Sequence, residues 1–127
     1  IWSVKHVRGG LVDLEFMVQY LILANAHRHP AIVSGNVATA LKRLGAHDLL
    51  DGVDTGALIQ AHADLQGTQS LLRLCFSGKF TEEAASPDFR NLLARLMGTE
   101  SFEGVRERLV ETQKLIGDVY DRIVGQD

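Results

Sequence analysis

The segment Lys5-His-Val-Arg-Gly-Gly-Leu-Val-Asp-Leu-Glu-Phe-Met-Val-Gln19 joins two cations, a glycine pair and the start of a long apolar run. The glycines let the backbone turn tightly or approach a ligand closely. The apolar run predicts a helix over residues 11–26 that begins directly beside the two cations. A helix start with flanking cations can bind a phosphate or a carboxylate. The alternative is that the glycines only form a turn and the cations are solvated.

Four residues of this segment form a candidate contact site: Lys5, Arg8, Gly9 and Gly10. Their character suits either a substrate phosphate or a carboxylate of a neighbouring domain, and the local sequence does not separate these two roles. His6 lies within the same segment and can contact an anion when it is protonated. A loop histidine of no special role is the alternative for that position.

Two acids follow at the start of the predicted helix, Asp13 and Glu15. Side chains two residues apart on a helix point about 200° away from each other, so these carboxylates cannot act on one atom as a general acid and base. Asp13 is expected to interact with the helix dipole or to pair with Lys5 or Arg8, and Glu15 to pair with another helix or domain. We therefore predict interface roles for both acids and no catalytic residue in this chain.

Helical periodicity continues to the end of the chain and predicts an all-α bundle of about five helices with a long carboxy-terminal helix. Apolar spacing, capping residues and breakers place the helices at residues 11–26, 36–44, 54–76, 87–97 and 102–124. The chain is expected to be one helical domain, 1–127, with a cationic lead-in loop over 1–10 and the bundle over 11–127. Because it opens at Ile1-Trp2 without an initiator methionine or a signal peptide, we expect it to be part of a larger enzyme.

Three details of packing follow from the same patterns. The first helix carries one apolar face with Leu14, Met17, Val18, Leu21 and Ile22 and another with Phe16, Tyr20 and Leu23, and both are expected to be buried. Cys75 has apolar neighbours and is expected to be a core thiol rather than a nucleophile. The polar stretch from Thr81 to Ser86 is the best candidate for a mobile loop.

The last predicted helix carries a stripe with heptad spacing: Phe102, Val105, Leu109, Thr112, Ile116, Val119 and Ile123. Such a stripe can dimerise a chain as a coiled coil. Three heptads inside a helical domain more often pack against sibling helices, so we expect the stripe to lie in the core of this domain.

Composition limits the classes of partner. The net charge is −3 and the 13 Lys and Arg residues are spread along the chain, which argues against nucleic-acid binding. The longest apolar stretch is interrupted by polar residues and is too short to span a membrane. A single cysteine agrees with a reducing, cytoplasmic location. The histidines are too poorly spaced for a zinc site, so no metal site is predicted.

The segment Lys-x-x-Arg-Gly-Gly-Leu-Val-Asp-Leu-Glu-Phe-x-x-Gln-Tyr resembles the junction that follows a nucleotidyltransferase domain in the bacterial bifunctional glutamine synthetase adenylyltransferase/adenylyl-removing enzymes. The segments His29-Pro30, Ala40-Leu41-x-x-Leu44, Gln69-x-x-Leu72-Arg73-Leu74 and Phe102 to Val124 are similar to that family's carboxy-terminal helical domain. The resemblance covers nearly the whole chain. It implies that the chain follows the adenylylating nucleotidyltransferase domain of such an enzyme.

The resemblance also implies a function for the parent enzyme. It would use ATP and a divalent metal such as Mg²⁺ to transfer AMP to a tyrosine of glutamine synthetase, remove that AMP by phosphorolysis, and respond to glutamine and to PII signalling proteins. The helical domain itself would hold no cofactor and would carry or transmit control. Two alternatives stay open: the helical domain of a PII uridylyltransferase, and a free-standing helical interaction module without enzymatic activity.

Overall fold

The computed structural model describes residues 1–50 and 52–125, so the last two residues of the predicted bundle lie outside the described part. The described part forms five α-helices and two short 3₁₀ helices, and it contains no strand. The α-helices are α1 (Leu11–Asn25), α2 (Val37–Ala46), α3 (Thr55–Cys75), α4 (Pro87–Met97) and α5 (Phe102–Ile123), and the 3₁₀ helices are η1 (Pro30–Ile32) and η2 (Glu82–Ala84). The predicted fold class and the predicted long final helix are therefore confirmed.

Side-chain caps explain why four of the helices begin where they do. The residue before each helix accepts a hydrogen bond from a backbone N–H in the first turn, which satisfies a donor that has no partner inside the helix. These capping residues are Asn36, Asp54, Ser86 and Ser101. Pro87 occupies the first position of α4, where its missing N–H costs nothing. Helix starts are thus specified locally.

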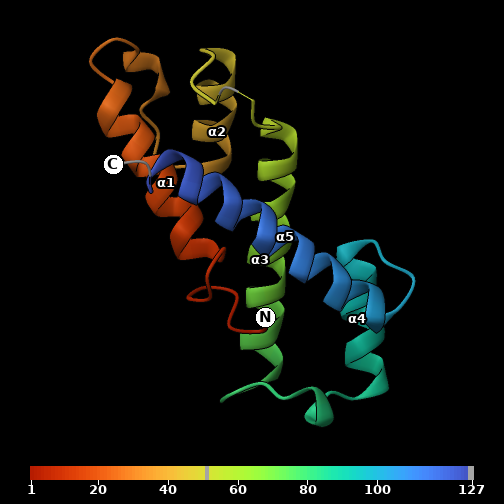
Figure 1. Cartoon of the computed structure of the whole chain (residues 1–127). Helices are drawn as coiled ribbons and strands as arrows, with labels where there is room; N and C mark the ends of the chain where they lie inside the picture. Colours follow the sequence, from red (N-terminus) through yellow and green to blue (C-terminus); the bar gives the residue numbers. More distant parts are fainter. Residues whose placement is uncertain (51, 126–127) are drawn as a thin grey trace.

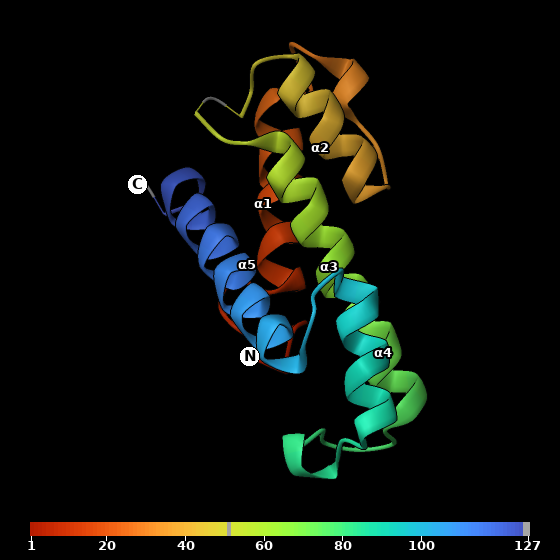
Figure 2. The same cartoon turned by 90° about the vertical axis from the view of Figure 1, so that its right-hand side faces the viewer.

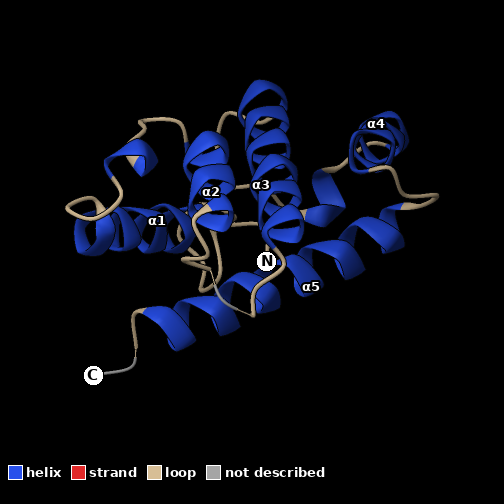
Figure 3. Ribbon diagram, turned by 90° about the horizontal axis from the view of Figure 1, so that it is seen from above, coloured by secondary structure: helices blue, strands red, loops and turns tan. Residues whose placement is uncertain are grey.

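The helices lie in an arrangement that leaves α4 apart from α1 and α2. Seen from above, α1, α2 and α3 lie next to one another, and α5 runs along one side of them toward α4 (Figure 3). α4 packs against the carboxy-terminal half of α3 and against α5 (Figure 2). The long α3 and α5 therefore connect the two ends of the domain (Figure 1).

The core follows the predicted stripe of α5. Its members Val105, Leu109, Thr112, Ile116 and Val119 are all buried. The four apolar members, Val105, Leu109, Ile116 and Val119, pack in one cluster with apolar residues from the other four α-helices. The stripe thus packs against the other helices of the chain, and the expectation of intramolecular packing is confirmed.

The expectation that both apolar faces of α1 are buried was wrong for the second face. Phe16 is 50% exposed, Tyr20 39% and Leu23 84%. Val12, on the same side of the helix, is 40% exposed. We call these four side chains the apolar row. The reason is geometric: α2, α3 and α5 cover only the side of α1 that carries Leu14, Met17 and Leu21.

The prediction of a core thiol at Cys75 was also wrong. Cys75 and its neighbours Arg73 and Leu74 are exposed, and only Leu72 on this turn is buried. Cys75 lines an open hollow with Asp88 and Leu92 of α4, so apolar neighbours in sequence do not bring it into the core.

The stretch expected to be mobile contains η2 and is held by several hydrogen bonds. The Arg90 side chain donates to the backbone carbonyls of Glu82 and Ala85. The indole Nε1 of Trp2 donates to a carboxylate oxygen of Glu82 at 3.0 Å. This stretch therefore ties the start of the chain to α4 instead of standing free.

Candidate functional site

The lead-in segment, residues 1–10, lies against α5 in a defined conformation. The side-chain amide of Gln113 donates to the carbonyl oxygen of Ile1 at 2.7 Å. The Trp2 ring stacks on Phe102 with centroids 5.4 Å apart and contacts Phe80 at 5.0 Å. Val4 is 2% exposed. The predicted loop is therefore an ordered part of the domain's packing.

The two glycines of the predicted site are required by close backbone approach. Gly9 has φ of +78°, and a Cβ there would lie 1.9 Å from the carbonyl oxygen of Gln113. A Cβ at Gly10 would lie 2.4 Å from the carbonyl oxygen of Val4. No side chain fits at either position without a backbone shift. In the described structure, Gly9 allows the lead-in segment to approach the backbone of α5, and Gly10 allows it to fold back on its own backbone.

The start of α1 has its first donors occupied. The N–H of Leu11 donates to the carbonyl of Val4 and the N–H of Val12 to the carbonyl of Lys5, both at 2.9 Å. The N–H of Gly9 donates to the carboxylate of Asp13 at 2.7 Å. A phosphate at this helix start would have to displace these bonds. The geometry therefore favours a structural role for the turn over direct phosphate contact.

Arg8 reaches away from this turn to α5. Its guanidinium donates two hydrogen bonds to the carboxylate of Asp121, and these bonds raise the pKa of Arg8. Asp13, for which either an interaction with the helix dipole or a pairing with Lys5 or Arg8 was predicted, accepts the Gly9 N–H, whereas Arg8 pairs with Asp121. Both Arg8 and Asp121 are more than half exposed. The pair ties the lead-in segment to the end of α5 at the surface.

Lys5 takes part in a different site. It lines a cavity of about 740 Å³ together with His6, Arg73 and Lys79. The apolar part of the lining includes Trp2, Leu72, Phe76 and Phe80. We call this site the basic cavity. Sequence reasoning missed Arg73 and Lys79 because they lie 68 and 74 residues from Lys5 and no local motif marks them.

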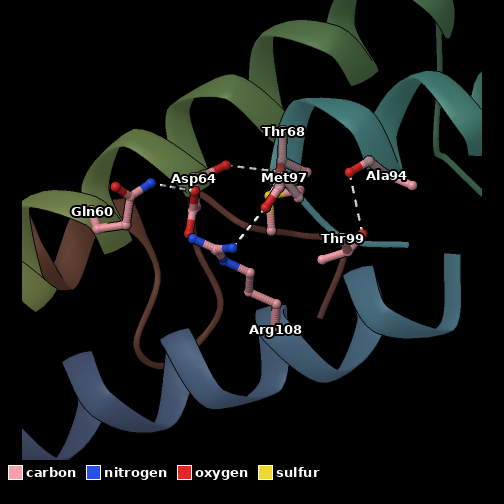
Figure 4. Close-up of polar contacts among 7 residues, drawn as sticks. All are labelled: Gln60, Asp64, Thr68, Ala94, Met97, Thr99 and Arg108. Carbon is pink, nitrogen blue, oxygen red and sulfur yellow. Dashed lines mark hydrogen bonds and ion pairs between the residues drawn. The ribbon is translucent and has the colours of Figure 1, made fainter. Parts of the chain in front are cut away.

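A buried polar network joins α3, the end of α4 and α5 (Figure 4). Asp64, which is 7% exposed, accepts hydrogen bonds from Arg108 Nε at 2.8 Å and from Gln60 at 3.0 Å. Arg108 also donates to the carbonyl of Met97 at 2.7 Å, which satisfies the end of α4. Among the described residues, both carboxylate oxygens of Asp64 accept a hydrogen bond, as a buried charge requires. The network therefore has a structural role, which is to hold α3, α4 and α5 together.

Glu15 lies on a different side of α1 from Asp13, near the buried His62. Glu15 and His62 line a second cavity of about 550 Å³. Burial lowers the pKa of His62, and the charge of Glu15 partly opposes that shift. Within the described residues, His62 Nε2 has no hydrogen-bond partner. Asp13 and Glu15 therefore do not converge, as the helical geometry predicts, and each serves a separate local contact.

The described residues contain no group of three His, Cys, Asp or Glu side chains that could hold a metal ion. None of the helices in the described ranges has both the length and the apolar character that crossing a bilayer demands. The geometry therefore offers a basic cavity, an exposed apolar row and structural ties.

Comparison with known proteins gives consistent results. Residues 2–124 match the family model described as GlnD PII-uridylyltransferase. The bifunctional glutamine synthetase adenylyltransferase/adenylyl-removing enzyme of Xanthobacter autotrophicus is 36% identical over 124 residues, and the match covers 98% of this chain and 12% of that enzyme. The enzyme of the same description from Rhodopseudomonas palustris (strain TIE-1) is 33% identical over 125 residues, with 98% and 13% covered.

A third relative, from Bradyrhizobium sp. (strain BTAi1), carries the same description and is 35% identical over 129 residues, with 99% of this chain and 13% of the relative covered. The chain thus spans about one eighth of the length of the curated relatives it matches. No solved structure matches the chain.

Proposed function

The chain belongs to the GlnD PII-uridylyltransferase family, and from that premise we propose that it is the helical domain of a glutamine synthetase adenylyltransferase/adenylyl-removing enzyme. The observation that carries this proposal is the similarity to enzymes of that description along 98% of the chain. The parent enzyme would transfer AMP from ATP to glutamine synthetase and remove it again. It would act in the cytoplasm.

Within this parent, we propose a supporting and regulatory role for the domain. ATP and Mg²⁺ would be held by a preceding nucleotidyltransferase domain, because the described residues of this chain offer no cluster of metal-binding side chains. Control by glutamine and by a PII signalling protein would pass through the helical domain to its catalytic neighbour.

We place the contact surface with the preceding domain, called the seam below, at the apolar row and the Arg8–Asp121 pair. Four apolar side chains in one row on α1 are the kind of exposed patch that marks a protein interface. Phe16 of the row also contacts Tyr120 of α5 at 6.2 Å between ring centroids. Tyr120 and Asp121 both lie in the last turns of α5, so the row and the ion pair border the same end of that helix.

The seam is tested in the full-length protein with Leu23→Ser and Arg8→Ala. We expect both variants to lower AMP transfer to glutamine synthetase while the same changes leave the isolated domain folded, because neither side chain belongs to the core. Leu74→Ser is the matched control, since Leu74 is 83% exposed on α3 and lies outside the row. Full activity of both variants, or an equal loss of activity with Leu74→Ser, would contradict the location of the seam on this surface.

A second candidate function is the helical domain of a PII uridylyltransferase. The observation that favours it is the description of the matching family model. One assay separates the two: the full-length protein is offered glutamine synthetase with ATP and a PII protein with UTP. Labelling of glutamine synthetase with AMP supports the main proposal, and labelling of PII with UMP supports the second. A protein that labels neither substrate would support the free-standing interaction module.

A further inference from the structure

We propose that the basic cavity binds a small phosphate-bearing molecule with an apolar body. The cavity lies between the lead-in segment, the last turns of α3 and the segment that follows α3. Figure 1 shows the start of the chain beside the lower half of α3. This proposal goes beyond the proposed function, because it assigns a ligand to this domain itself and does not depend on glutamine synthetase.

The cavity is lined by basic side chains that have no acidic partner in the described part of the chain. Among the described residues, the side chains of Lys5, Arg73 and Lys79 make no hydrogen bond or ion pair, and all three are exposed. In contrast, Arg8 and Arg108 each bind a carboxylate. Within residues 1–50 and 52–125, no acidic side chain lines the cavity. In a chain of net charge −3, this concentration of basic groups creates a local field that attracts anions.

The walls of the basic cavity are largely apolar and are held by contacts among their own side chains. Leu72, Phe76 and Phe80 form much of the apolar lining beside Trp2. Trp2 is fixed in place, because its Nε1 donates to Glu82 and its ring stacks on Phe102. Phe76 and Phe80 pack edge to face with centroids 4.8 Å apart. These mutual contacts make the wall a preformed surface, which suits an apolar ligand group better than a bare ion.

The basic cavity has the size of a small-molecule site. The volume of about 740 Å³ falls within the range of roughly 300–1,000 Å³ that is typical of small-molecule sites. A phosphate group alone would fill only part of this space. A ligand that places its phosphate among the Lys and Arg side chains and its apolar body against the aromatic wall would use both features. An extended nucleic acid does not fit, because the basic groups surround one cavity and form no stripe.

The test uses phenyl phosphate as the probe, with inorganic phosphate and phenol as its two separate halves. Binding to the 127-residue chain is measured by chemical-shift titration of backbone amides. We expect saturable shifts at Lys5, Arg73 and Lys79, and tighter binding of phenyl phosphate than of either half. Arg73→Gln and Lys79→Gln should each weaken binding about tenfold, which is typical of the loss of one charge-assisted hydrogen bond.

Lys42→Gln is the matched control. Lys42 is an exposed lysine on α2 that does not line the cavity, so this variant should bind as the unaltered chain does. Circular dichroism checks that every variant is folded. Equal binding by the cavity variants, equal loss with Lys42→Gln, or the absence of saturable shifts would overturn the proposal. Binding to the isolated chain but not to the full-length protein would also overturn it, because the cavity would then be a contact site for another domain.

Discussion

The carboxylate of Asp64 on α3 and the guanidinium of Arg108 on α5 form a 2.8 Å ion pair across 44 positions of sequence. The Asp64 side chain is 7% exposed, whereas that of Arg108 is 33% exposed. Arg108 also binds the carbonyl of Met97 at the end of α4. One arginine therefore holds three helices together at the point where α4 joins the rest of the domain (Figure 4).

Replacing Arg108 by Leu should reduce the free energy of unfolding by about 3 kcal/mol, because Asp64 would remain buried without its counter-charge. Urea unfolding monitored by circular dichroism measures this change. Arg28→Leu is the matched control at an exposed position, and its effect should stay within about 0.5 kcal/mol. A similar small effect for Arg108→Leu would show that the pair contributes little to stability.

Gly9→Ala should destabilise the domain by about 2–4 kcal/mol. The new Cβ would collide with the carbonyl of Gln113, and a left-handed backbone is strained in alanine. Gly35→Ala provides the control, because nothing lies within 4 Å of a Cβ at Gly35 and its φ is not positive. Thermal unfolding compares the two variants. Equal melting temperatures would contradict the close packing of the lead-in segment on α5.

Leu109→Ala should cost about 2–5 kcal/mol of stability, because Leu109 is fully buried at the centre of the α5 stripe. Its neighbour Val110 is 52% exposed, so Val110→Ala should change the free energy of unfolding by no more than about 0.5 kcal/mol. Chemical denaturation of the two variants gives both values. If they were equally stable, the stripe would lie at the surface.

The buried His62 should make stability depend on pH. Burial lowers its pKa in the folded state, so the unfolded chain, with a histidine pKa of about 6.5, takes up the proton first as the pH falls. The stabilising contribution is therefore complete above about pH 6.5 and is lost progressively below it. The free energy of unfolding measured between pH 7.5 and 5.5 should fall less steeply for His62→Gln than for the unaltered chain.

His27→Gln, a substitution of an exposed histidine, is the matched control for that measurement. Identical slopes for the unaltered chain and His62→Gln would show that His62 is not buried in the neutral form.

Local signals were enough to predict the helices. The caps at Asn36, Asp54 and Ser86 act on the first turn of their own helices, so neighbouring residues determine each start. The period of α5 likewise predicted which of its side chains enter the core. These features depend on residues close together in the chain.

Contacts between distant residues were not predictable in the same way. The ion pairs of Arg108 with Asp64 and of Arg8 with Asp121 form only after the helices have packed. The same packing places Lys79 and Lys5 in the lining of one cavity. The exposure of Cys75 likewise depends on which side of α3 is covered by α4, and helical period alone does not specify that.

We propose that this chain is a non-catalytic helical domain of an enzyme that adenylylates glutamine synthetase. The most direct test is the intact mass of glutamine synthetase after incubation with ATP and Mg²⁺, with either the full-length protein or the 127-residue chain. We predict that the full-length protein adds the mass of AMP to each modified subunit and that the 127-residue chain adds none. AMP transfer by the purified chain alone, or no transfer by the full-length protein, would contradict the claim.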